Sequence, residues 1–270
     1  MRIFILFPLL CAVALVFGAD VCSAQVSVVK VERSKPFPDA RVRVVSPLNG
    51  ESVRPFSPEV RLEVFGFKPG VQTETKRKNL VANSSKGQHV HLIVDNEPYE
   101  AIYDVSKPVV LKNLSVGPHT LVVFPSRSYH ESIKSEGAAH VVNFNVVSSL
   151  MAVSPPDLSA PALIYSRPKG VYKDKDAESV MVDFYLRNTT LGPDGYKVKL
   201  FVFEGARASR SSLVALEVFE VWQPAFVTGL KSGKYTFLLE LFDSRGNRVP
   251  GIFGSARRLI QVVRRTSTGG

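Results

Sequence analysis

The chain has 270 residues, of which 45% are hydrophobic and 21% are charged, and its 34 lysines and arginines exceed its 24 aspartates and glutamates to give a net charge of +10. This composition is typical of a globular protein of one or two domains. It excludes a collagen, a coiled coil and a wholly disordered chain, because the apolar content is too high for disorder and no short repeat dominates.

The first 24 residues have the pattern of an export signal. Arg2 is followed by an apolar run over residues 3–18 and then by the small residues Cys22-Ser23-Ala24, which predicts cleavage near Ala24. The run is short for a membrane span, so an uncut anchor is the less favoured alternative. Both cysteines lie in this segment, and a chain exported without them must be stable through its core alone. We expect a secreted or periplasmic bacterial protein with no stable membrane span.

Short runs of alternating apolar residues, separated by turn-forming residues, follow one another along the remaining chain and predict strands. In the first half the expected strands are 41–46, 59–67, 89–95, 99–104, 109–113, 119–125 and 138–147. In the second half they are 162–166, 179–188, 197–204, 212–222, 226–229, 235–243 and 257–263. The run at 212–222 suits either a strand or a helix.

The two sets of strands resemble each other in order. Residues 114–121, Leu-Ser-Val-Gly-Pro-His-Thr-Leu, match residues 230–237, Leu-Lys-Ser-Gly-Lys-Tyr-Thr-Phe, at an offset of 116. Residues 60–64 match 180–184 in the same way, which indicates a diverged internal duplication. About seven short strands in each copy, without helices, are typical of a β-sandwich.

The repeated segment resembles the entry to the penultimate strand of immunoglobulin-like and fibronectin III-like modules. This resemblance implies that Tyr235 forms a tyrosine corner, with its polar atom bonded to upstream backbone, and that His119 is a variant of it. We expect an all-β protein of two tandem sandwiches, at 39–148 and 162–265. An N-terminal extension at 25–38 precedes them, a proline- and serine-rich linker at 149–161 joins them, and a disordered tail at 266–270 follows.

The five histidines all lie in the first copy. His89 and His91 are two residues apart on an expected strand, so both point to one face while the apolar residues between them point to the other. Two such imidazoles are able to ligate zinc or copper if a third ligand approaches, and the candidates are His130, His140, Asp95 and Glu100. The alternative is a polar strand face with no cofactor. The first copy is also similar, through residues 47–50, 89–95 and 117–121, to a family of small histidine-bearing bacterial periplasmic domains of unknown function.

The loop at 124–134 is much longer than its counterpart at 243–247. It combines a guanidinium, an aromatic ring, an imidazole and a carboxylate, and loops at sandwich ends commonly carry binding sites. We interpret these residues as a recognition patch, together with residues from the neighbouring strand: Arg127, Tyr129, His130, Glu131, His91 and Asp95. The alternative is a self-packed loop in which Arg127 pairs with Glu131 and Tyr129 covers the sandwich end.

The charge distribution and the catalytic motifs that the sequence lacks limit the functions that we expect. The second half carries most of the positive excess, which suits an anionic glycan or an envelope protein better than a nucleic acid. The sequence after residue 24 has no cysteine nucleophile, Gly-x-Ser-x-Gly elbow, glycine-rich phosphate loop or His-Glu-x-x-His motif. We therefore expect a non-enzymatic binding module of the cell envelope. The alternatives are a metal-binding protein or metal-assisted enzyme that uses the first domain, and an accessory protein that recruits a partner strand at a sheet edge.

Overall fold

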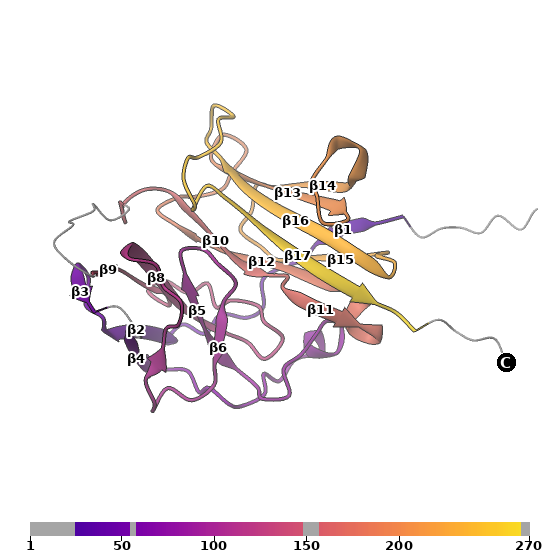
Figure 1. Ribbon diagram of the computed structural model, residues 1–270. Helices are drawn as coiled ribbons and strands as arrows, with labels where there is room; N and C mark the ends of the chain where they lie inside the picture. The colour runs from indigo at the N-terminus through magenta and orange to yellow at the C-terminus, as the bar shows by residue number, and fades with distance from the viewer. Residues whose placement is uncertain (1–24, 55–57, 148–156, 266–270) are drawn as a thin grey trace, which may run out of the picture.

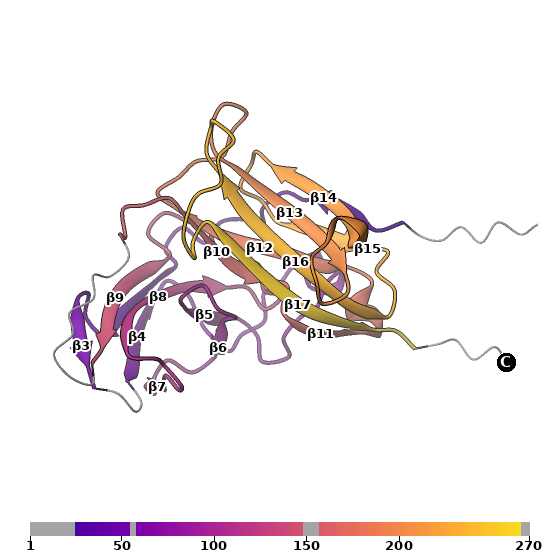
Figure 2. The same ribbon diagram turned by 45° about the horizontal axis from the view of Figure 1, so that its top comes forward.

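The computed structural model describes residues 25–54, 58–147 and 157–265. The expected signal peptide at 1–24, the linker at 149–161 up to residue 156, and the tail at 266–270 lie outside the described residues. The described chain forms strands and three short 3-10 helices, arranged as two β-sandwiches that lie side by side (Figure 1; Figure 2). This confirms the all-β expectation. No helix among these residues is long and apolar enough to cross a membrane.

Sandwich 1 packs a three-stranded sheet, in the order β2-β4-β7, against a five-stranded sheet in the order β3-β9-β8-β5-β6. Only the pair β3 and β9 is parallel. A 3-10 turn, η1 (Lys76–Asn79), lies in the long loop between β4 and β5. The strands are β2 (Arg41–Ser46), β3 (Glu51–Val53), β4 (Glu59–Phe65), β5 (His89–Val94), β6 (Glu100–Ile102), β7 (Val109–Val110), β8 (Gly117–Ser126) and β9 (His140–Val146).

Sandwich 2 repeats this arrangement with the sheets β15-β12-β10 and β11-β17-β16-β13-β14, and its parallel pair is β11 with β17. The strands are β10 (Ala162–Arg167), β11 (Gly170–Lys173), β12 (Val180–Arg187), β13 (Lys197–Glu204), β14 (Leu213–Phe219), β15 (Ala225–Thr228), β16 (Gly233–Phe242) and β17 (Ser255–Val263), with 3-10 turns η2 (Asp174–Ala177) and η3 (Arg210–Ser212). Each strand of sandwich 1 has its counterpart eight labels later, as a duplication predicts. The ambiguous run at 212–222 contains a strand.

Both copies close one end of the sandwich with the expected corner. The backbone N–H of Lys231 donates to the Tyr235 hydroxyl over 3.1 Å. In sandwich 1, Nε2 of His119 lies 2.8 Å from the carbonyl oxygen of Ser115, which is again four residues upstream. Because a carbonyl oxygen only accepts, this imidazole nitrogen carries the proton. The corner is therefore conserved between the copies although the ring has changed.

Strand β1 (Ser27–Lys30) lies within the segment that the sequence pattern left as an extension outside both sandwiches. It pairs antiparallel with β15, so Val28 lies opposite Val227, and it adds a fourth strand to the β15-β12-β10 sheet. The first described strand of the chain therefore belongs to the second sandwich. Four residues are too few for a periodic pattern to reveal this pairing, and nothing local to them identifies a partner about two hundred residues away.

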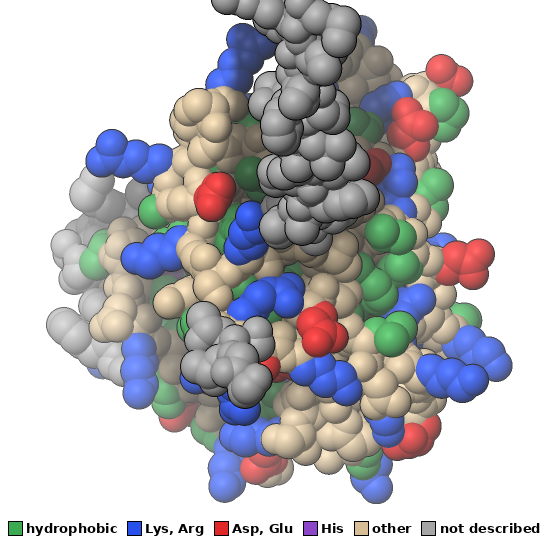
Figure 3. All heavy atoms as spheres, turned by 90° about the vertical axis from the view of Figure 1, so that its right-hand side faces the viewer, with side chains coloured by type: hydrophobic (Ala, Val, Ile, Leu, Met, Phe, Trp, Pro, Cys, Tyr) green, Lys and Arg blue, Asp and Glu red, His purple; other side chains and the backbone are tan. Residues whose placement is uncertain are grey.

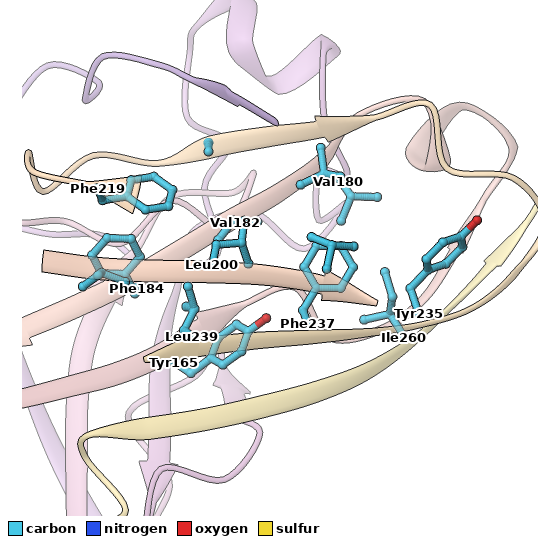
Figure 4. Packing of buried hydrophobic residues seen from close by; sticks show 14 of the residues in the cluster. Tyr165, Val180, Val182, Phe184, Leu200, Phe219, Tyr235, Phe237, Leu239 and Ile260 are labelled. Atoms are coloured by element: carbon cyan, nitrogen blue, oxygen red, sulfur yellow. The ribbon is translucent and has the colours of Figure 1, made fainter. Parts of the chain in front are cut away.

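The core of sandwich 2 is built from the residues of its two sheets that point toward each other. Figure 4 shows Phe184 and Phe219 facing each other there, and their rings meet edge to face with centroids 5.3 Å apart. Leu200, Phe237 and their neighbours, all close to fully buried, complete the cluster. Sandwich 1 has a smaller core of the same design, which includes Leu92, Leu121 and Phe144.

The two sandwiches pack sheet against sheet. The face of β5 and β8 that points away from the core of sandwich 1 lies against the outer face of β10 and β12. Ile93, Val122 and Phe124 meet Ile164 and Tyr185 there, and the rings of Phe124 and Tyr185 stack with centroids 4.9 Å apart. These apolar contacts fix the relative position of the sandwiches by excluding water from a shared cluster.

Polar groups also cross this interface, and they are buried. Lys134 Nζ donates to Asp183 Oδ1 over 2.5 Å, and both side chains are almost fully enclosed. Asn96 inserts its side chain into sandwich 2, where Nδ2 donates to the carbonyl oxygens of Leu163 (2.9 Å) and Ile252 (2.7 Å) and Oδ1 accepts from the N–H of Tyr165 (2.8 Å). Since buried polar groups are costly without partners, these bonds specify one docking geometry.

We predict that Asn96→Ala lowers the free energy of unfolding by about 2–4 kcal/mol, because it removes three interface hydrogen bonds and leaves buried backbone groups unpaired. Asn96 also has a positive φ of 59°. Asn113→Ala is the matched control, because Asn113 has the same φ but is exposed. Urea unfolding measures both variants. A loss for Asn96→Ala no larger than that for Asn113→Ala would show that the interface bonds are not stabilising.

Candidate metal centre

Three histidines meet where the sandwiches touch. His89 and His91 point from β5 toward sandwich 2, on the face opposite the core residues of this strand, as their spacing predicts. His130 comes from the loop after β8. The nearest ring nitrogens of the three lie within 4.8 Å of one another. His89 and His91 are fully buried and His130 is 9% exposed. The strand face that carries the pair is therefore covered by sandwich 2, and does not face solvent.

The loop after β8 is folded so that His130 returns over the sheet. An isolated bridge joins Ser126 to Ser132, and the N–H of His130 donates to the carbonyl oxygen of Arg127 over 2.8 Å. His130 itself has a φ of 70°, the left-handed conformation that reverses the chain within a tight turn. The third candidate ligand is thus delivered by backbone geometry.

The outer ring nitrogens of His89 and His91 have hydrogen-bond partners. Nδ1 of His89 lies 3.0 Å from the carbonyl oxygen of Gly87, so this nitrogen carries the proton and Nε2 carries a lone pair. Nδ1 of His91 lies 3.1 Å from the hydroxyl oxygen of Ser166 in β10. Histidines that bind metals commonly donate their other ring N–H to such an oxygen, which fixes the tautomer and the ring orientation. This arrangement is therefore that of a supported ligand set.

The lone pair of His89 is the centre of the cluster. Its Nε2 is 3.0 Å from Nε2 of His91 and 3.2 Å from Nδ1 of His130. One lone pair accepts one well-directed proton. The Nε2 of His89 therefore cannot accept good hydrogen bonds from both neighbouring imidazoles. Nitrogens that ligate zinc tetrahedrally at 2.0–2.1 Å are about 3.3 Å apart, close to both separations. Each of these two pairs therefore has the spacing of two ligands of one cation, and all three nitrogens lie within 4.8 Å of one another.

Burial keeps these rings neutral. It lowers the pKa of His89 to about 4, although the hydrogen bond to Gly87 opposes the effect. Burial likewise lowers the pKa of His91 and of His130 well below the ordinary value, and the charge of Arg167 adds to this in both cases. The neutral imidazole is the form that binds a metal.

The residues that surround the histidine cluster were not predicted from the sequence. The ring of Tyr99 stacks on His91 with centroids 3.6 Å apart, and Lys169 Nζ lies 3.8 Å from the centroid of Tyr99. Arg167 is buried, donates to the hydroxyl of Tyr172 over 3.0 Å, and has an unpartnered Nε. Neither Arg167 nor Lys169 forms a salt bridge with any described residue. The centre therefore lies in a positively charged environment that sequence order alone does not reveal.

The other loop residues of the expected recognition patch are buried elsewhere in the same loop. Arg127, Tyr129 and Glu131 are each at most 3% exposed, because residues 34–37, the loop with η1 and sandwich 2 cover them. Arg127 Nη1 lies 3.9 Å from Glu131 Oε1, as the alternative interpretation expects. Of the four loop residues, only His130 reaches the cluster. These side chains are therefore largely enclosed by the protein itself.

Glu131 holds the N-terminal segment in place. Its carboxylate accepts from the N–H and hydroxyl of Ser34 over 2.8 and 2.7 Å, and Arg77 donates to it over 2.7 Å. Burial on its own would raise the pKa of this carboxyl, but the charges of Lys134 and Arg127 and the bonds from Ser34 together lower it. The loop thus ties the segment after β1 to both sandwiches.

The remaining candidate ligands lie apart from the cluster. Asp95 Oδ2 is 2.5 Å from Nδ1 of His119, and its Oδ1 accepts from the N–H of Thr120. Nδ1 of His140 accepts from the N–H of Val44 over 3.2 Å, and Glu100 is exposed on β6. Among the candidates that the sequence offered as a third ligand, the structure brings only His130 to His89 and His91.

Comparison with known proteins gives a fold likeness only. No family model and no curated protein matches the chain, so the similarity of the first half to histidine-bearing periplasmic domains stays a resemblance. Fibronectin(III)-like modules of Clostridium thermocellum CbhA are 12% identical, with a TM-score of 0.27 over 83% of this chain and 94% of that chain. Domains 4 and 5 of the S-layer protein SbsC are 11% identical, with a TM-score of 0.21 over 86% and 100%. Dimeric latent PorU from Porphyromonas gingivalis is 14% identical, with a TM-score of 0.26 over 90% and 21%.

The strand pairing defines the structural class of this protein. The two copies share the sheet orders and corner of immunoglobulin-like and fibronectin III-like modules, and the chain is a tandem β-sandwich protein of that type.

The pair of His119 and Asp95 predicts a pH dependence of stability. The hydrogen bond that His119 donates to Asp95 raises the pKa of His119 above its ordinary value of 6.5, although burial opposes this. The folded state therefore favours the protonated ring, and the resulting stabilisation is complete below 6.5 and lost as the pH rises through the raised pKa.

We expect the difference in unfolding free energy between the natural protein and Asp95→Asn to be largest near pH 6 and to shrink toward pH 9. Asparagine keeps an acceptor for Thr120, but it removes the charge and replaces the oxygen that faces Nδ1 of His119 by an NH2 donor, so the protonated ring loses its partner. Urea unfolding across this range measures the difference, and one that does not vary with pH would contradict the assignment.

Proposed function

We propose that this protein is a secreted or periplasmic, non-enzymatic module that binds one zinc or copper ion through His89, His91 and His130. The observation that carries the proposal is the convergence of three neutral imidazoles from two segments, with their nearest ring nitrogens within 4.8 Å of one another. The outer nitrogens of His89 and His91 are held by Gly87 and Ser166. The export pattern at residues 1–24 supports the location.

The enclosure of the centre supports a binding role over catalysis. A catalytic metal site keeps one coordination position open to water or substrate. Here Tyr99 covers His91, Tyr103 lies with its ring centroid 4.9 Å from that of His89, and sandwich 2 closes the remaining side. An ion in this position would be screened from substrates and would contact both sandwiches through the hydrogen bond to Ser166.

The charge around the centre bears on which ion it prefers. Three neutral imidazoles supply no negative charge, and Arg167 and Lys169 are near enough to lower the pKa of all three rings. A monovalent ion is repelled less by these cations than a divalent one. Copper(I) also accepts three imidazoles without a fourth ligand. We therefore expect copper(I) to bind more tightly than zinc(II).

Metal titration tests the proposal. After chelator treatment, the purified protein should bind one equivalent of copper(I) or zinc(II), measured by competition with a chromophoric chelator. Binding should raise stability by about 2.7 kcal/mol at a free-ion concentration one hundred times Kd. His89→Ala, His91→Ala and His130→Ala should each lose binding.

His140→Ala is the matched control, because it removes an imidazole of sandwich 1 that lies outside the cluster. It should bind the ion as the natural protein does. If no ion binds in excess of the His89→Ala variant, or if His140→Ala loses binding to the same degree, the metal function is wrong.

A second variant tests the electrostatic preference. Lys169→Met removes one positive charge beside the centre while keeping a long apolar side chain, so its affinity for zinc(II) should rise by roughly three- to tenfold. Lys173→Met is the control for net charge, since Lys173 is exposed on β11. Equal effects of the two substitutions would mean that Lys169 does not repel the bound ion.

A further inference from the structure

Strand β1 fills a gap between the two sheets of sandwich 2. On one side it pairs with β15, the edge of one sheet. On the other side, Lys30 reaches β14, the edge of the other sheet, where Nζ lies 2.8 Å from the Glu217 carboxylate and 3.1 Å from the carbonyl oxygen of Val218. Val26 and Val28 pack against the core. The strand thus covers apolar side chains that the open side of this sandwich would otherwise expose.

Sandwich 1 has no corresponding strand among its described residues. Its equivalent edge, β7, pairs only with β4 and is free on its outer side. A cavity of about 550 Å³ lies between this edge and the strands β5 and β6. Leu92, Val94, Leu111 and Leu114 give it an apolar lining, and Glu97 and Glu100 are among its polar residues. We refer to this cavity and the β7 edge as the β7 groove.

The charged contact of β1 also has its counterpart in the groove. In sandwich 2, Glu217 of β14 pairs in register with Leu200 of β13. In sandwich 1, Glu100 of β6 pairs in the same way with Leu92 of β5. Leu92 and Leu200 are equivalent in the duplication, so Glu100 is the equivalent of Glu217. Glu100 is exposed, and it forms no salt bridge with any described residue.

We propose that the β7 groove binds an extended segment of another protein as an added strand. The segment lies antiparallel to β7, as β1 lies antiparallel to β15. It places alternate apolar residues toward Leu92 and Leu114, and it carries a lysine or arginine two residues after the apolar residue opposite Val109, so that its charge meets Glu100. Backbone hydrogen bonds to β7 supply affinity, and the pocket and the carboxylate supply specificity. The partner is thus a peptide with the pattern of residues 26–30, Val-Ser-Val-Val-Lys.

This site is separate from the metal centre. The histidine cluster lies on the face of β5 that is covered by sandwich 2, whereas the groove opens at the side of sandwich 1, between its two sheets. Loss of metal binding therefore leaves the strand site intact, and the two proposals fail independently.

A peptide with the sequence of residues 25–33, blocked at both ends and carrying a photoreactive residue in place of Val28, is the probe. Fluorescence anisotropy with the purified full chain should show saturable binding of one peptide per chain. Photocrosslinks should map to residues 109–114. Glu100→Lys should weaken binding at least tenfold, and a peptide with Lys30→Glu should recover binding to that variant by restoring the opposite charges.

Glu63→Lys is the matched control, since it makes the same charge change at an exposed position of β4 in the same sandwich. It should leave binding unchanged. The proposal is overturned if the peptide does not bind saturably, if Glu63→Lys weakens binding as much as Glu100→Lys, or if the crosslinks map to β15 in sandwich 2, which would mean that the peptide has replaced β1.

Discussion

The packing of one sheet face of sandwich 1 against β10 and β12 is the contact on which the other features depend. That face carries the imidazoles of His89 and His91 beside Ile93, Val122 and Phe124. Once water is removed from it, each polar group needs a partner within the protein. The salt bridge of Lys134 with Asp183 and the bond from His91 to Ser166 meet this need across the interface. The same exclusion of water keeps the imidazoles neutral.

The two copies of the duplication differ in what covers them. Sandwich 1 has its five-stranded face covered by sandwich 2 and the edge at β7 open. Sandwich 2 has its corresponding edge completed by β1. On the face shown in Figure 3, Lys and Arg side chains are scattered among acidic and apolar ones and do not form one basic patch. The positive charge visible on this face is therefore dispersed, which does not favour a single polyanion site there.

How far the sequence predicts this structure depends on the range of each interaction. The period of two placed His89 and His91 on one face, and a local motif identified the corners at His119 and Tyr235, because both are set by neighbouring residues. The covering of that face by sandwich 2 was not predictable, since it depends on how two separate surfaces fit. The burial of Arg127 and Glu131 was not predicted, for the same reason. A charged loop is expected to face solvent unless its partners, here Ser34 and Arg77, are known. Arg167 ends β10 and Lys169 follows it, and no sequence motif marks either residue.

The place of β1 changes how the two sandwiches are connected. Because β1 and β17 both belong to sandwich 2, sandwich 1 is inserted in the chain between the first and second strands of its neighbour. During synthesis from the N-terminus, β1 emerges before its partner β15 exists, and its pairing must close a loop of about two hundred residues. A pulling force applied to β1 and β17 would act across sandwich 2 alone. Sandwich 1 would carry load only after β1 had been stripped from β15, so the histidine cluster is mechanically shielded by the strand that completes the other domain.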